Sequence, residues 1–147
     1  PAWNKVIINE RQKYDLAKML DRKEVYYDID MMMMHNAEAK SDGLEAYNEP
    51  NYTPEQIEKF VQQYDLKDKE GIGILLLAES YNKAVEMATY HFVAINMNTG
   101  KVLFQERIKG EPGGFGLRNY WAGSIHRVVE KIQKDYYKKW KEQYSVK

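Results

Sequence analysis

The residues of this sequence whose types and spacing are best suited to chemistry are glycines that precede its last predicted helix. The run from Gly110 to Gly116 reads GEPGGFG, and an arginine follows it closely. Backbone N–H groups ahead of a helix N-terminus can bind an anion, and a nearby guanidinium can pair with it. The sequence therefore suggests a phosphate or carboxylate site. Its candidate ligand-binding residues are Gly113, Gly114, Gly116 and Arg118.

The pattern of this loop does not match a known nucleotide-binding loop. It is neither GxxxxGK[ST] nor GxGxxG after a parallel strand, so it lacks the residues that hold a nucleotide and magnesium. In the alternative interpretation, the glycines only allow a tight turn from strand to helix, and Phe115 and Trp121 pack beneath it. This structural role is the plainer of the two.

Two further clusters resemble metal sites. Met31 to Met34 and His35 offer thioether and imidazole ligands suited to copper(I), but side chains along a strand alternate between faces and methionine commonly fills cores. Asp28 and Asp30, on one face of the same predicted strand, could hold a cation or share a proton. A solvated strand face gives the same pattern. We therefore predict no metal and no cofactor.

No set of catalytic residues is apparent. Ser124 and His126 are two residues apart on a predicted helix, so their side chains diverge and cannot form a nucleophile and base pair. His91 is expected on a strand and His126 on a helix surface. No GxSxG, HExxH or Walker pattern occurs. The sequence therefore favours a protein without enzymatic activity.

Aromatic and basic residues alternate near the C-terminus, a mixture found in protein interfaces and nucleic-acid grooves. The plainer interpretation is one buried helix face and one solvated lysine face. With 22 basic and 22 acidic residues the formal charge is zero, which gives no overall attraction to nucleic acid. We expect a protein partner instead. The residues concerned are Tyr136, Tyr137, Trp140 and Tyr144 with Lys134, Lys138, Lys139 and Lys141.

Length and composition indicate one domain. A chain of 147 residues can bury a substantial core, so we predict a single domain over residues 1–147. The absence of cysteine excludes disulfides and thiolate sites within the chain. No apolar run approaches the roughly 18 residues of a membrane span. Because the chain starts at Pro1, we expect a processed or trimmed product.

Hydrophobic periodicity predicts an antiparallel sheet. Three consecutive strands are expected at Ile72–Ala78, Thr89–Met97 and Lys101–Lys109, with a glycine-containing turn at Asn98–Gly100 between the last two. The first of these is apolar without alternation, so we expect it inside the sheet with both faces covered. Glu24–Met34, in which apolar and polar residues alternate, is expected to be a fourth strand.

Three helices are expected around this sheet, at residues 10–20, 54–66 and 118–144. Asn9 is a plausible cap for the first, after a short strand or extended lead-in, and Thr53 with Pro54 begins the second. In the third, apolar residues from Trp121 to Trp140 recur at helical spacing, and this face is expected to cover the sheet. His35–Thr53 reads as a long loop that is functional or mobile. The predicted class is α+β, with a mainly antiparallel sheet of about four strands packed by three helices in two layers.

Two stretches, NMNTGKVLFQERIKGEPGGFGLRNYWAGS and EVYYDIDMMMMHNA, resemble uncharacterised proteins of the Gram-negative cell envelope that are often predicted to be lipoproteins. In that family a hairpin leads through a G-G-F-G loop into a tryptophan-containing terminal helix. The resemblance implies an exported domain, periplasmic or tethered to the outer membrane by a lipid attached upstream of this chain. It implies no catalytic residue.

These observations give three hypotheses. The first is a non-enzymatic cell-envelope domain that binds a protein or other macromolecular partner, with the His35–Thr53 loop contributing. The second is a small-ligand or anion-binding domain that uses the glycine-rich loop. The third is a metal-dependent hydrolase built on Asp28 and Asp30.

Overall fold

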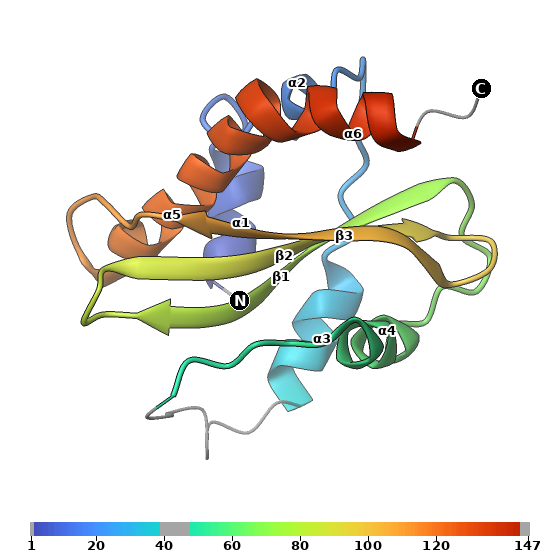
Figure 1. Ribbon diagram of the computed structural model, residues 1–147, viewed down its shortest axis with the longest axis horizontal. Coiled ribbons are helices and arrows are strands. Elements are labelled where there is room, and N and C mark those ends of the chain that lie inside the picture. Colours follow the sequence, from blue (N-terminus) through green and yellow to red (C-terminus); the bar gives the residue numbers. More distant parts are fainter. Residues whose placement is uncertain (1, 39–47, 145–147) are drawn as a thin grey trace. The chain divides into compact units, whose positions relative to one another are not determined.

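The computed structural model describes residues 2–38 and 48–144. The chain divides into two compact units, which are described separately: a sheet unit of residues 31–109 and a helical unit of residues 1–30 and 110–147. Both helices and antiparallel strands are present, so the α+β class is confirmed (Figure 1).

The sheet unit contains three antiparallel strands in the order β1-β2-β3, joined by short hairpin connections. The strands are β1 (Ile72–Asn82), β2 (Met87–Asn96) and β3 (Lys101–Gly110). Gly100 has the positive φ of +71° that the predicted turn requires. The three strands predicted between residues 72 and 109 are thus confirmed.

The prediction that Ile72–Ala78 lies inside the sheet is wrong. The central strand is β2, whose residues are buried from Ala88 to Ile95. The Ile72 and Ile74 side chains on β1 are 67 % and 41 % exposed. Two tight hairpins in succession place the middle strand between the others, and an apolar run alone does not reveal this order.

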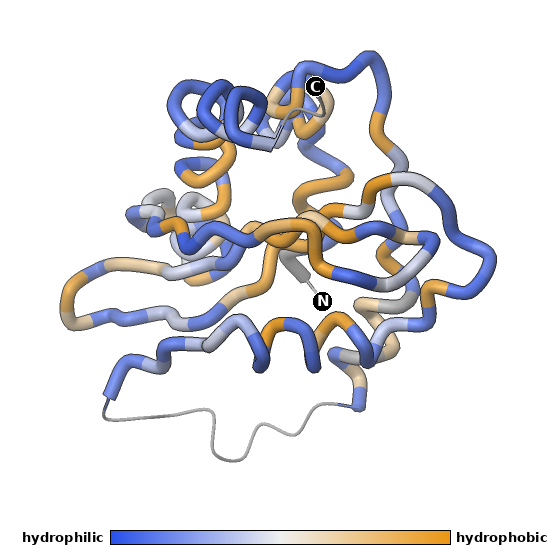
Figure 2. Tube along the Cα trace, turned by 45° about the vertical axis from the view of Figure 1, so that its right-hand side comes forward, coloured by the Kyte–Doolittle hydropathy of each residue, from blue (hydrophilic) through white to orange (hydrophobic). Residues whose placement is uncertain are grey.

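The core of the sheet unit lies between one face of the sheet and α4 (Pro54–Gln62). Figure 2 shows hydrophobic segments along the strands and an alternation of hydrophobic and hydrophilic segments along this helix. Thr53 caps the helix as predicted, and it forms a capping box with Gln56. The central buried residues are Ile57, Val61, Leu75, Val93 and Ile95.

The fourth strand predicted at Glu24–Met34 is wrong. Helix α3 runs over Asp30–Glu38, and residues 24–29 have no regular structure. Methionine is a good helix former, and Asp30 stands in the first turn, where a negative charge favours a helix. The predicted loop at His35–Thr53 is therefore helical at its start, and its residues 39–47 lie outside the described part of the chain.

In the helical unit, the single helix predicted at residues 10–20 is wrong, because two shorter helices occupy the N-terminal region. Helix α1 covers Ala2–Asn9, where a strand or lead-in was expected, so Asn9 ends a helix and does not cap one. Helix α2 is the short segment Leu16–Met19, and Asp15 caps it by accepting the Lys18 backbone N–H. Buried Tyr14 lies between them and donates its hydroxyl to the Ala122 carbonyl at 3.2 Å.

The predicted helix at 118–144 is confirmed as a nearly continuous rod with a π-helical turn inside it. Its parts are α5 (Leu117–Lys131), η1 (Ile132–Tyr136) and α6 (Tyr137–Tyr144). At about 100° per residue, Trp140 would stand about 100° out of phase with Trp121, and the extra residue of a π turn removes that offset. Both tryptophans are accordingly buried. That this rod covers the sheet stays a prediction.

Candidate functional site

The carboxylate of Glu79 links residues of all three strands of the sheet unit. Glu79 of β1 contacts His91 of β2 at 2.5 Å from Oε2 to Nε2, and Arg107 of β3 donates to its Oε1 from Nη2 at 2.6 Å and from Nε at 2.9 Å. The Glu79 side chain is 0 % exposed and that of Arg107 is 34 % exposed. Arg107 is therefore part of a network whose central carboxylate is buried.

The segment before α4 completes this network. The Tyr52 backbone N–H donates to Glu79 Oε2 at 2.9 Å. Ser80 and Thr89 donate their hydroxyls to Glu49 Oε1 at 3.0 and 3.3 Å. The two ends of residues 49–52 are thus held on β1 and β2.

A register shift between Ala78 and Ser80 explains why β1 can make both sets of contacts. Leu77 lies opposite His91, and Ser80 lies opposite Thr89. The side chains of the consecutive residues Glu79 and Ser80 therefore both lie on the face of the sheet that carries His91. Bulges of this kind re-aim side chains.

The chemistry of Glu79 is that of a fixed anion. Burial raises the pKa of its carboxyl, but the donors of Arg107, His91 and Tyr52 together outweigh burial, and the net pKa is below its ordinary value. Each oxygen already accepts two hydrogen bonds. This arrangement suits a structural clamp better than a general base, which must reach a substrate proton.

One concave surface is a groove between α4 and the β2–β3 hairpin. It has a volume of about 750 Å³ and an apolar floor surrounded by polar side chains. Ligand pockets commonly measure roughly 300–1,000 Å³. The floor residues are Val61, Tyr64, Leu66, Met97 and Val102, and the rim includes Glu58, Gln62, Lys67, Asn98, Thr99 and Lys101.

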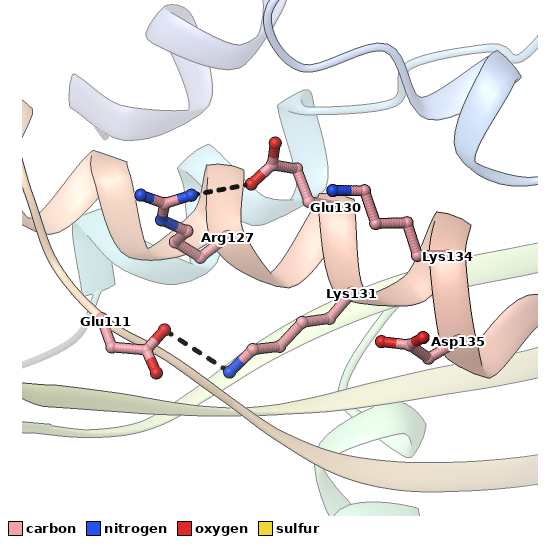
Figure 3. A pocket seen from close by; sticks show the side chains of 6 residues that line it. All are labelled: Glu111, Arg127, Glu130, Lys131, Lys134 and Asp135. Carbon is pink, nitrogen blue, oxygen red and sulfur yellow. Dashed lines mark hydrogen bonds and ion pairs between the residues drawn. The ribbon is translucent and has the colours of Figure 1, made fainter.

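Another concave surface, of about 390 Å³, lies along the C-terminal rod of the helical unit. Figure 3 shows ion pairs among its charges: Lys131 lies 3.5 Å from Glu111, and Arg127 lies 3.1 Å from Glu130. The Arg127 hydrogen bond lowers the pKa of Glu130. Lys134 and Asp135 complete the wall. A ligand would have to replace these ion pairs.

The glycine-rich loop is shaped by its approach to α5. Gly113 donates its N–H to the Tyr120 carbonyl at 2.8 Å, so that group is not directed toward an anion. A Cβ atom on Gly123 would meet the backbone of Gly113, and Gly114 has a φ of +119°. Anion binding by Gly113, Gly114, Gly116 and Arg118 stays a prediction.

The expected packing of Phe115 beneath this loop is wrong, because its side chain is 96 % exposed. Trp121 is buried as expected. Arg118 donates from Nε to Asn119 Oδ1 at 3.2 Å.

The other polar candidates do not converge. Asp30 is in α3 and Asp28 precedes it, and both are exposed. Within the described residues no three His, Cys, Asp or Glu side chains are grouped as a metal site. Ser124 donates to the Trp121 carbonyl at 2.6 Å, and His126 Nδ1 lies 3.0 Å from the Lys13 carbonyl oxygen.

The sequence analysis overlooked Glu79, its partnership with Arg107, and the groove. One signal was available: the charged residue Glu79 directly follows the apolar run Ile72–Ala78 of a predicted strand. The contact between Glu79 and Arg107 depends on the bulge and on strand order, which no local pattern specifies.

Comparison of the chain with protein-family models, curated proteins and solved structures finds no match. Within the residues that the structure describes, none of the helices combines the length and the apolar character needed to cross a membrane.

Proposed function

We propose that this chain is a non-enzymatic binding domain that holds a segment of a protein partner in the groove between α4 and the β2–β3 hairpin. The observation that carries the proposal is the groove itself, with apolar Leu66, Met97 and Val102 on its floor and polar residues around them. Protein interfaces combine an apolar centre with a polar rim in this way.

The charges of the rim favour an acidic partner segment. Lys67 and Lys101 line the groove together with one carboxylate, that of Glu58. Among the described residues, neither lysine ammonium has a carboxylate within ion-pair distance. We therefore expect an apolar anchor side chain flanked by Asp or Glu.

The hydrogen bonds that the candidate polar side chains already make within the chain support a binding role over a catalytic one. The Glu79 carboxylate is saturated with donors, and Ser124 and His126 bond to backbone carbonyl oxygens. The resemblance to envelope proteins supports a periplasmic or membrane-tethered location, which belongs to the same proposal.

The test is selection of displayed short random peptides against the purified chain, followed by affinity measurement with labelled peptides. We expect selected peptides to carry an apolar anchor beside Asp or Glu and to shift the methyl NMR signals of Val61, Leu66 and Val102. A double variant, Lys67→Glu with Lys101→Glu, should bind about tenfold more weakly or worse. Lys83→Glu, an exposed lysine in the other hairpin, is the matched control.

Failure to enrich any peptide would contradict the proposal. So would peptides whose affinity is the same for the double variant and for wild type.

The alternative function is small-ligand or anion binding at Gly113, Gly114, Gly116 and Arg118. It ranks second because the Gly113 N–H is already donated within the helical unit. Stabilisation by phosphorylated or carboxylated compounds in a thermal-shift screen, lost in Arg118→Ala, would support it.

A further inference from the structure

On the outer edge of β1, seven residues have no neighbouring strand in the part of the chain that the structure describes. The Gly71 carbonyl accepts the Met97 N–H at 2.9 Å, so odd-numbered residues of this part of β1 bond to β2. Because the ladder alternates, the even-numbered residues direct their N–H and C=O groups outward. These residues are Ile72, Ile74, Leu76 and Ala78. Within the described part of the chain no other segment forms a backbone hydrogen bond with them.

This edge lacks the features that normally prevent strands from pairing. The sequence GIGILLLA from Gly71 to Ala78 has no charged residue and no proline. Natural edge strands are usually short, charged, bulged or covered. Here the straight part begins after Gly71, with its φ of +86°, and ends at the bulge after Ala78.

We propose that this edge pairs with the same edge of a second copy of the chain, antiparallel about a two-fold axis at Leu75. This register places Ile72 opposite the partner's Ala78 and Ile74 opposite the partner's Leu76. Each residue whose backbone N–H and C=O point outward then lies opposite another such residue. The outward backbone groups of both edges can therefore form hydrogen bonds with each other. The exposed side chains of Ile72 and Ile74 gain apolar neighbours.

The properties of this edge of β1 favour a second copy of the chain over a different protein as its partner. It is uncharged and therefore offers nothing to select a charged partner, whereas its own sequence complements it in length and in side-chain size. A shift by one residue would set outward groups against inward ones, and a shift by two would shorten the ladder. Two-fold pairing also closes the assembly and leaves no second β1 edge open.

The test is sedimentation velocity of the full chain from about 1 to about 100 µM, a range chosen because an interface confined to strand edges is small. We expect a concentration-dependent change from monomer to dimer. Ile74→Pro removes an outward N–H without touching the β1–β2 bonds, and Ile74→Lys adds a charge; either should weaken the dimer at least 100-fold. Val85→Lys, at an exposed site in the β1–β2 turn, should dimerise like wild type.

Amide hydrogen exchange gives a second readout that needs no variant. The N–H groups of Ile72, Ile74, Leu76 and Ala78 should gain protection as the concentration rises, while that of Leu75 is protected throughout. A monomer at every concentration would overturn the proposal and assign the edge to an extended segment of another protein. A dimer that persists in both Ile74 variants would also overturn it, because the contact would then lie elsewhere.

Discussion

Glu79→Gln should be among the most destabilising single substitutions in the sheet unit that leave the shape of the side chain unchanged. The carboxylate accepts four hydrogen bonds, two on each oxygen. The amide that replaces it has one oxygen and one NH₂ group, so with His91 protonated on Nε2 two donors lose their acceptor in either orientation and face another donor.

The magnitude follows from this geometry. A hydrogen bond to a charged group contributes about 1.5–3 kcal/mol, so two lost bonds cost about 3–6 kcal/mol. Arg107 is 34 % exposed and can regain water, which places the expected loss near the lower end, at about 3 kcal/mol. For a chain of this length, that lowers Tm by about 6–12 °C.

The loss should depend on pH in a defined direction. The folded-state pKa of Glu79 lies below its ordinary value of 4.5, so the carboxylate stabilises the fold at pH values above that value. This contribution disappears as the pH falls through the folded-state pKa. The difference between wild type and Glu79→Gln should therefore be largest near neutral pH and shrink below about pH 4.5.

The assay is urea unfolding followed by tryptophan fluorescence and circular dichroism at a series of pH values. The control is Glu70→Gln, an exposed carboxylate just before β1, which should change the free energy of unfolding by less than about 0.5 kcal/mol. If Glu79→Gln is as stable as this control at pH 7, the three-strand network contributes no net stability and our reasoning is wrong.

Three further substitutions test other parts of the fold by the same unfolding measurement. Thr53→Ala removes the capping box of α4 and should cost about 1 kcal/mol, whereas Thr53→Ser should restore most of it. Gly123→Ala would gain about 1 kcal/mol from helix propensity alone, but its Cβ would meet the Gly113 backbone, so we expect a net loss of about 1–3 kcal/mol. Tyr14→Phe removes the buried hydroxyl bond to Ala122 and should cost about 0.5–1.5 kcal/mol; no loss would show that this bond is not needed.

Local patterns predicted the parts of the fold that local interactions determine. The β2–β3 hairpin depends on alternation and on a glycine with positive φ, and the start of α4 depends on Thr53 and Pro54. The long C-terminal helix was predicted because its apolar face recurs over many turns. In each case the signal lies within one continuous stretch of the sequence.

The errors arose where two local interpretations were nearly equal. Glu24–Met34 alternates like a strand, but its methionines are also good helix formers, and the chain is helical from Asp30. In the same way, Ile72–Ala78 is apolar enough for an interior strand, although strand order makes it an edge. Tertiary contacts decide whether such a segment forms a helix, an edge strand or an interior strand, and these contacts cannot be read from a single sequence.

The functional features could not be predicted for a related reason. Glu79, His91 and Arg107 come from three strands, and their contact requires the strand order and the bulge together. The groove requires a helix and a hairpin that are more than thirty residues apart in sequence to lie side by side. Neither requirement appears as a motif.

The bulge after Ala78 divides β1 into two parts with different structural roles. Beyond Ala78 its polar residues, Glu79 and Ser80, hold the segment before α4 to the sheet. Before the bulge, the apolar edge from Ile72 to Ala78 makes no such bonds with other described residues, and we propose that it pairs with a second copy. The two roles are separable, because the Glu79 network is formed by side chains on the face of the sheet, whereas pairing is formed by backbone groups along the edge of β1. Loss of the network in Glu79→Gln should consequently release residues 49–52 while leaving self-association through β1 intact, provided that the sheet remains folded.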